Sequence, residues 1–301
     1  MTDSPPALSV SVVICTRDRP AAALNAARTV LADAPSVELI IVDQSTDGEA
    51  LARQVGALAS PRVTCIPCEP RGLSAARNVG VHASTGHVVA FLDDDCEAQS
   101  GWLVGLQAAF ARDERVALAF GNVRAAPYDR REGFVPAYHV NRFTIATDLG
   151  GKSHIEGIGA CMAIRRAAWT ALHGFDESLG AGAPFRAGED ADFVIRALLG
   201  GWHVAETPEA SVLHHGFRTW NEGRELIDSY MYGLGASNMK MLRLGGLRAV
   251  GPLAALAWRW AAGAPVVDLN HRPPRMARLR AFLRGARDSR RRPLQAGGRL
   301  A

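Results

Sequence analysis

Three consecutive carboxylates follow an apolar run in the first third of the chain. Asp93, Asp94 and Asp95 come directly after His87–Leu92, which has the composition of a buried strand. Carboxylate oxygens are hard ligands that suit Mg²⁺ or Mn²⁺, and three adjacent like charges favour a nearby cation. The alternative is a solvated loop, or an acidic N-terminus for the helix expected at Gly101–Ala111.

Two further clusters contain side chains capable of catalysis or metal binding. Glu189 and Asp190 open the helix expected at Asp190–Leu199, where carboxylates are also common as caps. His214 and His215 follow a short strand, and successive side chains of an extended chain point to opposite faces. Only one of the two histidines can therefore reach a given metal. Each cluster alone leaves both a structural and a functional interpretation open.

Short apolar strands alternate with helical segments through the first 120 residues. The expected strands are Val10–Cys15, Val37–Val42, Arg62–Ile66, His87–Leu92 and Val116–Phe120, and the expected helices are Ala21–Ala32, Glu49–Leu58, Ser74–Ala83 and Gly101–Ala111. This alternation predicts βαβ units, and hence an α/β fold with a mostly parallel central sheet flanked by helices. Open sheets of this kind bind ligands at the carboxyl ends of their strands, which is where Asp93 to Asp95 stand.

The second half of the chain is less regular. No clear period is found in 122–156. Helices are expected at Arg165–Leu172 and Glu222–Leu244, and strands near His203–Glu206 and Ala210–Leu213. We therefore expect a single α/β domain that is followed by a helical carboxyl-terminal extension.

An apolar stretch within the extension is interrupted by charges. Arg248 and Arg259 break the segment Leu247–Val267, so it lacks the uninterrupted length of a membrane-spanning helix. A packing or interfacial helix is expected instead, with Trp258 and Trp260 as candidate interface residues.

The formal charge is distributed unevenly along the sequence. Residues 271–301 contain ten arginines, one acid and no lysine, whereas the whole chain carries only +4, so residues 1–270 are net negative. A negative body is a poor nucleic-acid surface, and we expect no nucleic-acid partner. The arginine-rich end is either a solvated disordered tail or a segment that rests on anionic lipid headgroups.

The amino terminus and the cysteines indicate the cellular compartment. Met1–Leu8 has neither a basic stretch nor an apolar stretch, which predicts no signal peptide. Five cysteines, an odd number, fit a reducing compartment better than a disulfide framework. We expect a cytoplasmic protein, with peripheral contact at the inner face of the cell membrane through Leu247–Arg292 as a hypothesis.

Several motifs occur together in one order. They are SVVICTRDRP, IIVDQSTDG, RGLSAARNVGVHASTGHVVAFLDDD, GIGACMAIRRAAWTALHGFDESL and GEDADFVIRALLGGWHV. Together they resemble the family-2 glycosyltransferases over roughly residues 9–216, about two-thirds of the chain. The resemblance implies the glycosyltransferase type A fold, with a catalytic domain at 9–220 between a disordered 1–8 and carboxyl-terminal helices at 221–270. The arginine-rich tail, 271–301, completes the chain.

The resemblance also implies a role for each matched position. The residues implied to contact the nucleotide sugar are Thr16, Arg17, Asp43, Gln44, Arg77, Asn78, Asp93 and Asp94. Asp95 is implied to ligate a divalent cation, Mn²⁺ or Mg²⁺, and Asp93 to contact the ribose or the water shell of the metal. His214 is implied as the later metal ligand, with His215 as the alternative. Asp190 is implied as the catalytic base, supported by Glu189.

One position departs from the family pattern. Family members often have a second acid where this chain has Gln44. A carboxamide can still pair with a pyrimidine edge through both its donor and its acceptor, so the departure leaves the identity of the base open.

The sequence therefore predicts an inverting glycosyltransferase. It is expected to move a sugar from a nucleoside-diphosphate sugar to a hydroxyl of a glycan or lipid-linked acceptor, in cell-surface glycan or glycolipid synthesis. One alternative is a sugar-nucleotide pyrophosphorylase, although CTRDRP lacks the glycine-rich phosphate loop expected of that class. Another is a non-catalytic nucleotide-sugar binding module, which the presence of Asp93, Asp95, Asp190 and His214 disfavours.

Overall fold

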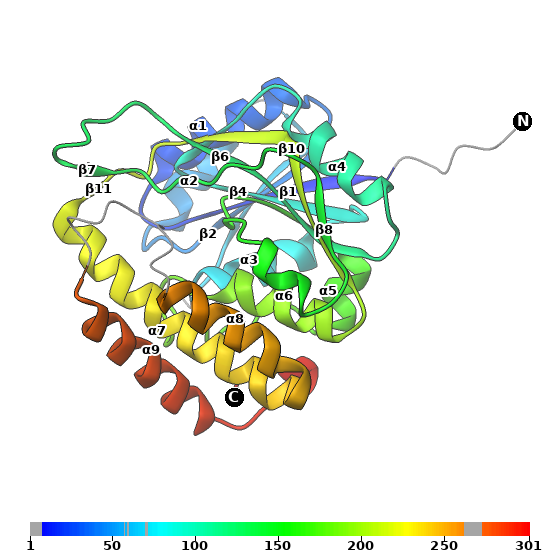
Figure 1. The fold of residues 1–301 in the computed structure, drawn as a ribbon. Coiled ribbons are helices and arrows are strands. Elements are labelled where there is room, and N and C mark those ends of the chain that lie inside the picture. Colours follow the sequence, from blue (N-terminus) through cyan, green and yellow to red (C-terminus); the bar gives the residue numbers. More distant parts are fainter. Residues whose placement is uncertain (1–7, 57, 59, 70–71, 262–272) are drawn as a thin grey trace, which may run out of the picture.

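The computed structural model describes residues 8–261 and 273–301, apart from residues 57, 59, 70 and 71 (Figure 1). The segment 1–8, expected to be disordered, therefore falls almost entirely outside the described residues. So do residues 262–270 of the expected carboxyl-terminal helices and residues 271–272 of the tail.

Four parallel strands form one half of the central sheet, in the order β3-β2-β1-β4. They are β1 (Val10–Thr16), β2 (Glu38–Asp43), β3 (Val63–Pro67) and β4 (Val88–Asp93). In β1, Thr16 pairs in register with Asp43, and Cys15 pairs with Asp93. The carboxyl ends of three strands therefore meet at one edge of the sheet, as the sequence predicts.

The other half of the sheet is mixed. Strand β9 (Cys161–Arg165) runs antiparallel between β4 and β6 (Val116–Ala125), and β6 pairs in parallel with β10 (His203–His214). Two short strands, β5 (Cys96–Ala98) and β8 (Thr144–Ala146), pair antiparallel with β10. The expected parallel pairing thus holds for the first four strands and for β6 with β10, whereas β9, β5 and β8 pair antiparallel with their neighbours.

Strand β10 joins two segments that the sequence predicts as separate strands. The predicted break falls at 207–209, which includes Pro208, and the ladder with β6 shifts register between Glu206 and Ser211. Proline has no N–H to donate, and an irregularity in the ladder is where a strand tolerates it. The chain continues beyond it to His214.

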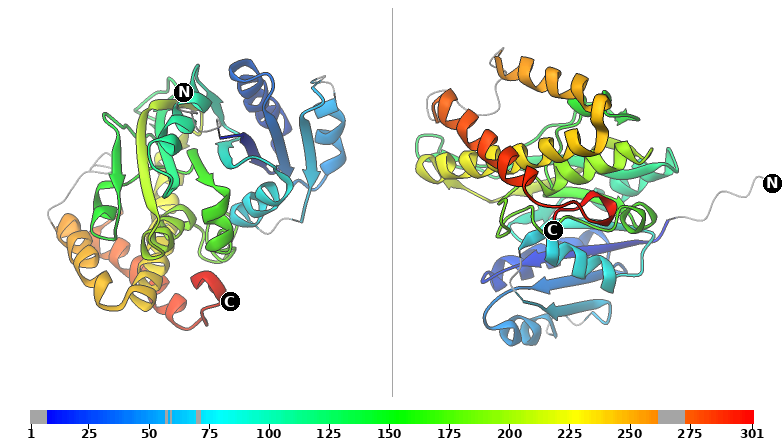
Figure 2. Two further views of the ribbon diagram at one scale, coloured as in Figure 1. Left: turned by 90° about the vertical axis from the view of Figure 1, so that its right-hand side faces the viewer. Right: turned by 90° about the horizontal axis from the view of Figure 1, so that it is seen from below.

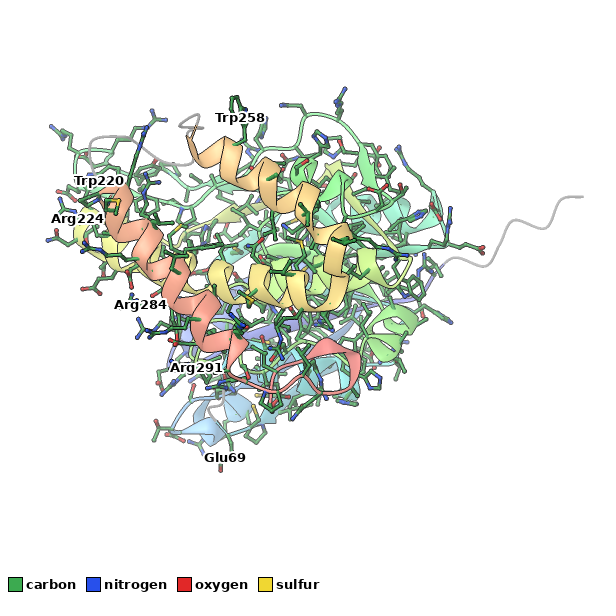
Figure 3. All side chains as sticks on the ribbon, turned by 60° about the horizontal axis from the view of Figure 1, so that its bottom comes forward. Glu69, Trp220, Arg224, Trp258, Arg284 and Arg291 are labelled. Atoms are coloured by element: carbon green, nitrogen blue, oxygen red, sulfur yellow. The ribbon has the colours of Figure 1, made fainter. Side chains whose placement is uncertain are left out.

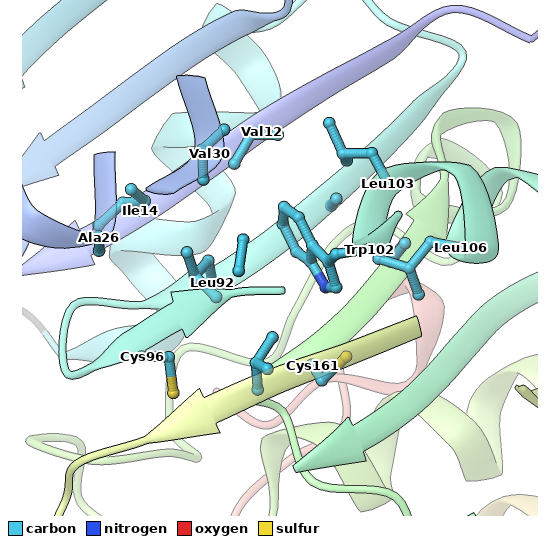
Figure 4. Close-up of a cluster of buried hydrophobic side chains, with 14 of the residues drawn as sticks. Val12, Ile14, Ala26, Val30, Leu92, Cys96, Trp102, Leu103, Leu106 and Cys161 are labelled. Carbon is cyan, nitrogen blue, oxygen red and sulfur yellow. The ribbon is translucent and has the colours of Figure 1, made fainter. Parts of the chain in front are cut away.

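The two faces of the sheet are covered by different helices (Figures 1 and 2). Val12 and Ile14 of β1 pack on the face covered by α1 (Pro20–Asp33) and α4 (Trp102–Ala111), whereas Val13 belongs to the core on the other face. Figure 4 shows part of the first core. Burying a side chain of this size contributes about 1.5–3 kcal/mol relative to exposing it.

The remaining helices of the α/β body are short. They are α2 (Gly48–Gly56), α3 (Leu73–Ala83), α5 (Arg166–Ala171) and α6 (Glu189–Leu199). The loosely patterned segment 122–156 contributes the end of β6, β8, a 3₁₀ turn at Gly151–His154, and β7 (Gly133–Phe134), which pairs with β11 (Arg218–Thr219).

Helix α7 (Trp220–Gly245) joins the carboxyl-terminal part to the α/β body. It starts at a capping box, in which Thr219 and Glu222 satisfy each other's backbone N–H groups. Further along, the Lys240 ammonium is completely buried and lies 2.6 Å from Asp192 of α6. A buried charge needs a partner, so this ion pair ties α7 to the helix that begins at Glu189.

The arginine-rich end is largely helical rather than a loose tail. Helix α8 (Val250–Ala261) follows α7, and α9 (Arg275–Arg290) packs along the outer side of α7 (Figure 2). Leu300 is buried against Leu179 and Phe185. Within the described part of the chain, none of the helices combines the length and apolar character that a bilayer crossing requires.

Candidate active site

A cavity of about 550 Å³ opens at the carboxyl ends of β1 and β4. The acidic run Asp93 to Asp95 lines one part of it, and the start of α6 with Glu189 and Asp190 lines another. His214, from the end of β10, also reaches this cavity. Residues that are more than 100 positions apart in the sequence thus share one site.

The three aspartates differ in their surroundings. Asp94 is almost fully buried and accepts a hydrogen bond from the Thr16 hydroxyl at 2.7 Å. Asp93 and Asp95 retain more exposure. Arg19 bridges two of the carboxylates, at 2.6 Å from Asp94 and 3.1 Å from Asp95. The sequence predicts a cation beside these three negative charges, and the guanidinium of Arg19 supplies part of that positive charge.

These contacts shift the pKa values of the two carboxyls in opposite directions. Burial raises the pKa of Asp94 to about 6, although the charge of Arg19 and the hydroxyl of Thr16 oppose the rise. Burial would also raise the pKa of Asp95, but the hydrogen bond and charge of His214, together with Arg19, lower it to about 2. Asp95 is therefore an anion at neutral pH and is suited to hold a cation.

His214 faces Asp95 in a way that suits metal binding. Its Nδ1 lies 2.8 Å from the carbonyl oxygen of Pro136, and a carbonyl can only accept, so Nδ1 carries the proton in this contact. Although burial opposes it, the hydrogen bond and charge of Asp95 raise the pKa of His214, and the protonated ring points its Nε2 at Asp95 Oδ1, 3.4 Å away. In the neutral ring the lone pair is on Nε2. Two electron pairs at that distance repel unless a proton or cation lies between them. A histidine fixed through its other nitrogen is a common arrangement for a metal ligand.

The candidate metal group consists of Asp95, Cys96 and His214, whose ligand atoms all lie within 4.8 Å of one another. Burial raises the pKa of the Cys96 thiol, so it stays protonated and is a poor ligand. Asp95 and His214 remain as a donor set that fits a divalent cation. His215 points elsewhere, with its Nε2 3.1 Å from Glu97, because adjacent residues of the strand face opposite ways.

Arg77 connects the acidic run to the start of α6. Its guanidinium is buried and lies 3.0 Å from Glu189 and 3.4 Å from Asp93. Burial and the neighbouring Asp190 raise the pKa of Glu189 to about 7, although Arg77 opposes the rise. Glu189 is thus held by Arg77. Asp190, whose Oδ1 accepts from the N–H of Ala191 at 2.6 Å, is the more exposed carboxylate at the cavity.

The residues implied to bind the nucleotide sugar divide into two groups. Those that line the cavity are Thr16, Arg17, Gln44, Arg77, Asp93 and Asp94. The Nε2 of Gln44 donates to the carbonyl of Glu69 at 2.9 Å, which leaves its side-chain oxygen for a ligand. Asp43 and Asn78 do not line the cavity.

Asn78 and Asp43 lie outside the cavity lining, and their implied contacts with the nucleotide sugar stay predictions. The Asn78 amide is buried, donates to Phe175 O and accepts from Phe175 N and the Trp169 indole, so its bonding capacity goes into holding that loop. Asp43 has no exposed surface, and its Oδ1 accepts from the N–H of Ser45. The neighbouring Gln44 faces the cavity in its place.

Comparison with known proteins decides the class of this site. The model of "Glycosyl transferase family 2" matches residues 11–171, more than half of the chain. The chain belongs to this family. As a family-2 glycosyltransferase it is an enzyme, and the alternatives of a pyrophosphorylase and a non-catalytic module give way to this class.

Two curated relatives are similar to this glycosyltransferase over about two-thirds of its length. The succinoglycan biosynthesis protein ExoM of Rhizobium meliloti is 30% identical over 217 residues, which cover 68% of this chain and 66% of ExoM. The pre-mycofactocin glycosyltransferase of Mycobacterium tuberculosis is also 30% identical, over 68% of this chain and 42% of that protein. The match therefore spans less than two-thirds of either relative.

Solved structures share the fold of this glycosyltransferase. TarS of S. aureus superposes with a TM-score of 0.61 at 16% identity, over 87% of this chain and 46% of that one. The mannosyltransferase PcManGT of Pyrobaculum calidifontis, solved with GDP-Man and Mn²⁺, gives 0.57 at 16% identity, over 94% and 87%. These similarities support the type A fold.

Several residues of the family-2 site carry no signal in the sequence. Arg186, Arg218 and Tyr230 line the cavity, as do Leu226 and Leu234. The last three lie on α7, beyond the motifs. Their spacing of four residues places them on one face of the helix, but the sequence gives no reason to turn that face toward the carboxylates. Arg19, which also lines the cavity, lies within the motif SVVICTRDRP.

Proposed function

We propose that this glycosyltransferase moves a sugar from a nucleoside-diphosphate sugar to an acceptor hydroxyl, with inversion at the anomeric carbon. The supporting observation is the convergence of Asp95, His214 and Asp190 on one cavity. Similar proteins support the same reaction. GalNAc-T7, a structural neighbour, was solved with UDP, GalNAc and Mn²⁺, and the relative ExoM is a succinoglycan biosynthesis protein. A cell-surface glycan or glycolipid is accordingly the proposed product.

In the proposed reaction Asp190 is the general base. It accepts the proton of the acceptor hydroxyl while that oxygen forms a bond to the anomeric carbon. The bond from this carbon to the diphosphate breaks at the same time, and the nucleoside diphosphate leaves with the electron pair. Attack from the face opposite the leaving group inverts the configuration. Base catalysis of this kind contributes roughly 10²–10⁴-fold.

Asp190 suits this role better than Glu189 because the two carboxylates have different partners. Glu189 is committed to Arg77 at 3.0 Å. Arg77 also contacts Asp93, so Glu189 and Arg77 together fix the start of α6 relative to the acidic run. Glu189 is therefore proposed as a positioning residue for its neighbour.

Asp95 and His214 are proposed to hold a divalent cation, Mn²⁺ or Mg²⁺. When bound, such a cation supplies Lewis-acid stabilisation of the charge that develops on the diphosphate. Thr16, Arg17, Gln44 and Asp93 are proposed to contact the nucleotide sugar, because they line the same cavity. Arg19 offsets the charge of Asp94 and Asp95 in the structure described here.

The function is tested by separating binding from transfer. A thermal-shift panel of UDP, GDP and dTDP sugars with Mn²⁺ identifies the donor, since a ligand that binds the native state raises the melting temperature. With that donor, Asp190→Asn should retain binding in calorimetry and lose transfer by roughly 10²–10⁴-fold. Asp95→Ala should lose the Mn²⁺-dependent part of donor binding.

A matched control comes from the exposed Asp148, whose carboxylate accepts from the N–H of Gly151 outside the cavity. Asp148→Asn should retain both binding and transfer. Equal loss of donor binding and transfer in folded Asp190→Asn would contradict its role as base. Unchanged Mn²⁺-dependent affinity in Asp95→Ala would contradict the metal assignment.

A further inference from the structure

Exposed apolar side chains are concentrated in the carboxyl-terminal helices. Among the described residues, eleven large hydrophobic side chains are exposed, and nine of them lie between residues 230 and 283; the others are Val104 and Ile145. Met276, Leu279 and Leu283 on α9 are 60%, 38% and 55% exposed. Their spacing of three and four residues places them on one face of the helix.

Helix α9 turns its small residues toward the protein and its large apolar residues outward, which is the reverse of an ordinary surface helix. A helix that only covers a protein core turns its leucines inward and its small or polar residues outward. In α9 the buried residues are Ala281, Gly285, Ala286 and Ser289. Met276, Leu279 and Leu283 face away from the body. Packing against α7 therefore does not explain where the apolar residues of α9 are placed.

Close contact with α7 fixes this orientation. A Cβ at Gly285 would lie 1.9 Å from the carbonyl oxygen of Tyr232, and a Cβ at Gly235 of α7 would lie 2.0 Å from that of Phe282. The two backbones therefore approach where only glycine fits. Because the inner face of α9 is held this closely, its outer face stays presented to the surroundings (Figure 3).

The outer face also concentrates positive charge. Helix α9 contains six arginines and one acid. Arg280, Arg287 and Arg290 are exposed around the apolar stripe, and within the described residues Arg280 and Arg290 form no ion pair. Figure 3 labels Arg284 on this helix, Arg291 just after its last residue, and Trp258, which is 75% exposed, near the end of α8. Guanidinium groups are well suited to phosphate oxygens.

We propose that the outer face of α9 docks on the surface of an anionic phospholipid bilayer. Met276, Leu279 and Leu283 enter the boundary between headgroups and acyl chains, and Arg280, Arg287 and Arg290 contact the lipid phosphates. An apolar stripe flanked by arginines is the pattern of a helix that lies in a membrane interface. The positive helix on an otherwise negative chain also gives attraction toward anionic lipid.

Docking at this face would bring the catalytic cavity close to the bilayer. Helix α7 lies between the two: Leu226, Tyr230 and Leu234 line the cavity, whereas Tyr232 and Gly235 contact α9. The cavity and the docking face are thus separated by α7 and α9, a thickness of about two helix diameters, or roughly 20 Å. A lipid-linked acceptor would meet the site at the membrane surface, a consequence that rests on the proposed function, whereas docking itself does not.

Vesicle flotation without donor or acceptor tests the docking. The full chain is mixed with vesicles of phosphatidylglycerol and phosphatidylcholine, or of phosphatidylcholine alone. It should float with the anionic vesicles only, and added salt should weaken binding because it screens exposed charges. Arg280→Gln with Arg290→Gln should weaken binding roughly fivefold for each arginine and roughly thirtyfold together. Leu279→Ser with Leu283→Ser should also abolish or strongly weaken it.

Matched variants outside the carboxyl-terminal helices serve as controls. Arg28→Gln with Arg62→Gln removes two exposed arginines outside α9. Val104→Ser removes an apolar side chain of α4 that is 68% exposed. Both should bind like wild type. The proposal is overturned if the wild type binds neither vesicle or both equally, or if the α9 variants bind no more weakly than the controls.

Discussion

Glu189 and Asp190 are adjacent carboxylates with different environments. Glu189 is buried on Arg77, and Asp190 lies more openly at the cavity. The sequence GED shows two acids at a helix start but not which of them a buried arginine will hold. That distinction depends on Arg77, which is 112 positions away along the chain.

The raised pKa of Glu189 predicts a dependence of stability on pH. Burial and Asp190 raise this pKa to about 7, above the ordinary value of 4.5. The folded protein therefore holds this proton more tightly than the unfolded chain does. The resulting stabilisation is complete below about pH 4.5 and is lost as the pH rises to about 7, by up to about 3 kcal/mol. Glu189→Gln should remove this part of the pH dependence in urea unfolding at about pH 5 and about pH 8.

Glu222 gives a control of opposite sign. Hydrogen bonds from the backbone N–H and the hydroxyl of Thr219 lower the pKa of this exposed cap. Its contribution is therefore present above the ordinary pKa of a glutamate and is lost on acidification. Glu222→Gln should reduce stability at neutral pH and matter less in acid. If Glu189→Gln changes stability equally at both pH values, the assigned environment of Glu189 is wrong.

At the scale of elements, the sequence predicts correctly the strands whose own residues form a clear apolar pattern. Strands β1, β2 and β4 are continuous apolar runs, so their positions and their shared carboxyl edge are predictable. Strands β5, β8 and β9 are short and acquire their partners from distant parts of the chain. Local pattern cannot indicate such pairings, and the antiparallel half of the sheet is accordingly missed.

The residues of the candidate site also divide into those whose placement the sequence predicts and those whose role depends on distant contacts. The motif residues at strand ends are brought together by the parallel register, which the alternation of strands and helices predicts. Asn78 lies in a motif too, yet its amide serves Phe175 and Trp169, and nothing local distinguishes that role from ligand binding. The choice of His214 over His215 needs the pairing of β10 with β5, which sets which side faces Asp95.

The glycines of the carboxyl-terminal helices predict a contrast in stability. Alanine is about 1 kcal/mol more favourable than glycine inside a helix. At Gly251 of α8 a Cβ meets nothing within 4 Å apart from its chain neighbours, but the following Pro252 disfavours helical backbone at an alanine, so Gly251→Ala should change stability little. At Gly285 a Cβ would lie 1.9 Å from the carbonyl oxygen of Tyr232, so α9 must move away from α7. Gly285→Ala should therefore lower the melting temperature.

Circular dichroism during heating measures both glycine variants. The contrast between two identical substitutions removes the general effect of helix propensity. Equal melting temperatures for Gly285→Ala and Gly251→Ala would show that α7 and α9 are not in close backbone contact.

At the scale of the whole molecule, the last residues described return to the active-site loop. Leu300 packs against Leu179 and Phe185, and its N–H donates to the buried carboxylate of Asp176 at 2.8 Å. Residues 178–188 then lead to Glu189 and line the cavity at Ala181 and Gly182. The arginine-rich segment, which the sequence separates from the catalytic domain, thus supports the loop before the proposed base.

This arrangement predicts that Leu300 restrains the loop. Leu300→Ala removes buried contacts with Leu179 and Phe185 and should destabilise the protein by about 2 kcal/mol, the lower end for a buried leucine. The loop should also open more often, because its outer packing is weakened. Arg186 is exposed in this loop, so limited trypsin digestion followed by mass spectrometry should show faster cleavage after Arg186. Donor binding should change little, since Thr16, Gln44 and Asp95 lie on other elements.

Leu247 provides the matched control, because it is 91% exposed. Leu247→Ala makes the same chemical change and should alter stability by no more than about 0.5 kcal/mol. Cleavage after Arg186 should stay at the wild-type rate in this variant. If Leu300→Ala lowers stability without speeding that cleavage, the segment stabilises the fold but does not restrain the loop. If both variants speed the cleavage equally, the effect does not arise from the contact of Leu300 with Leu179 and Phe185.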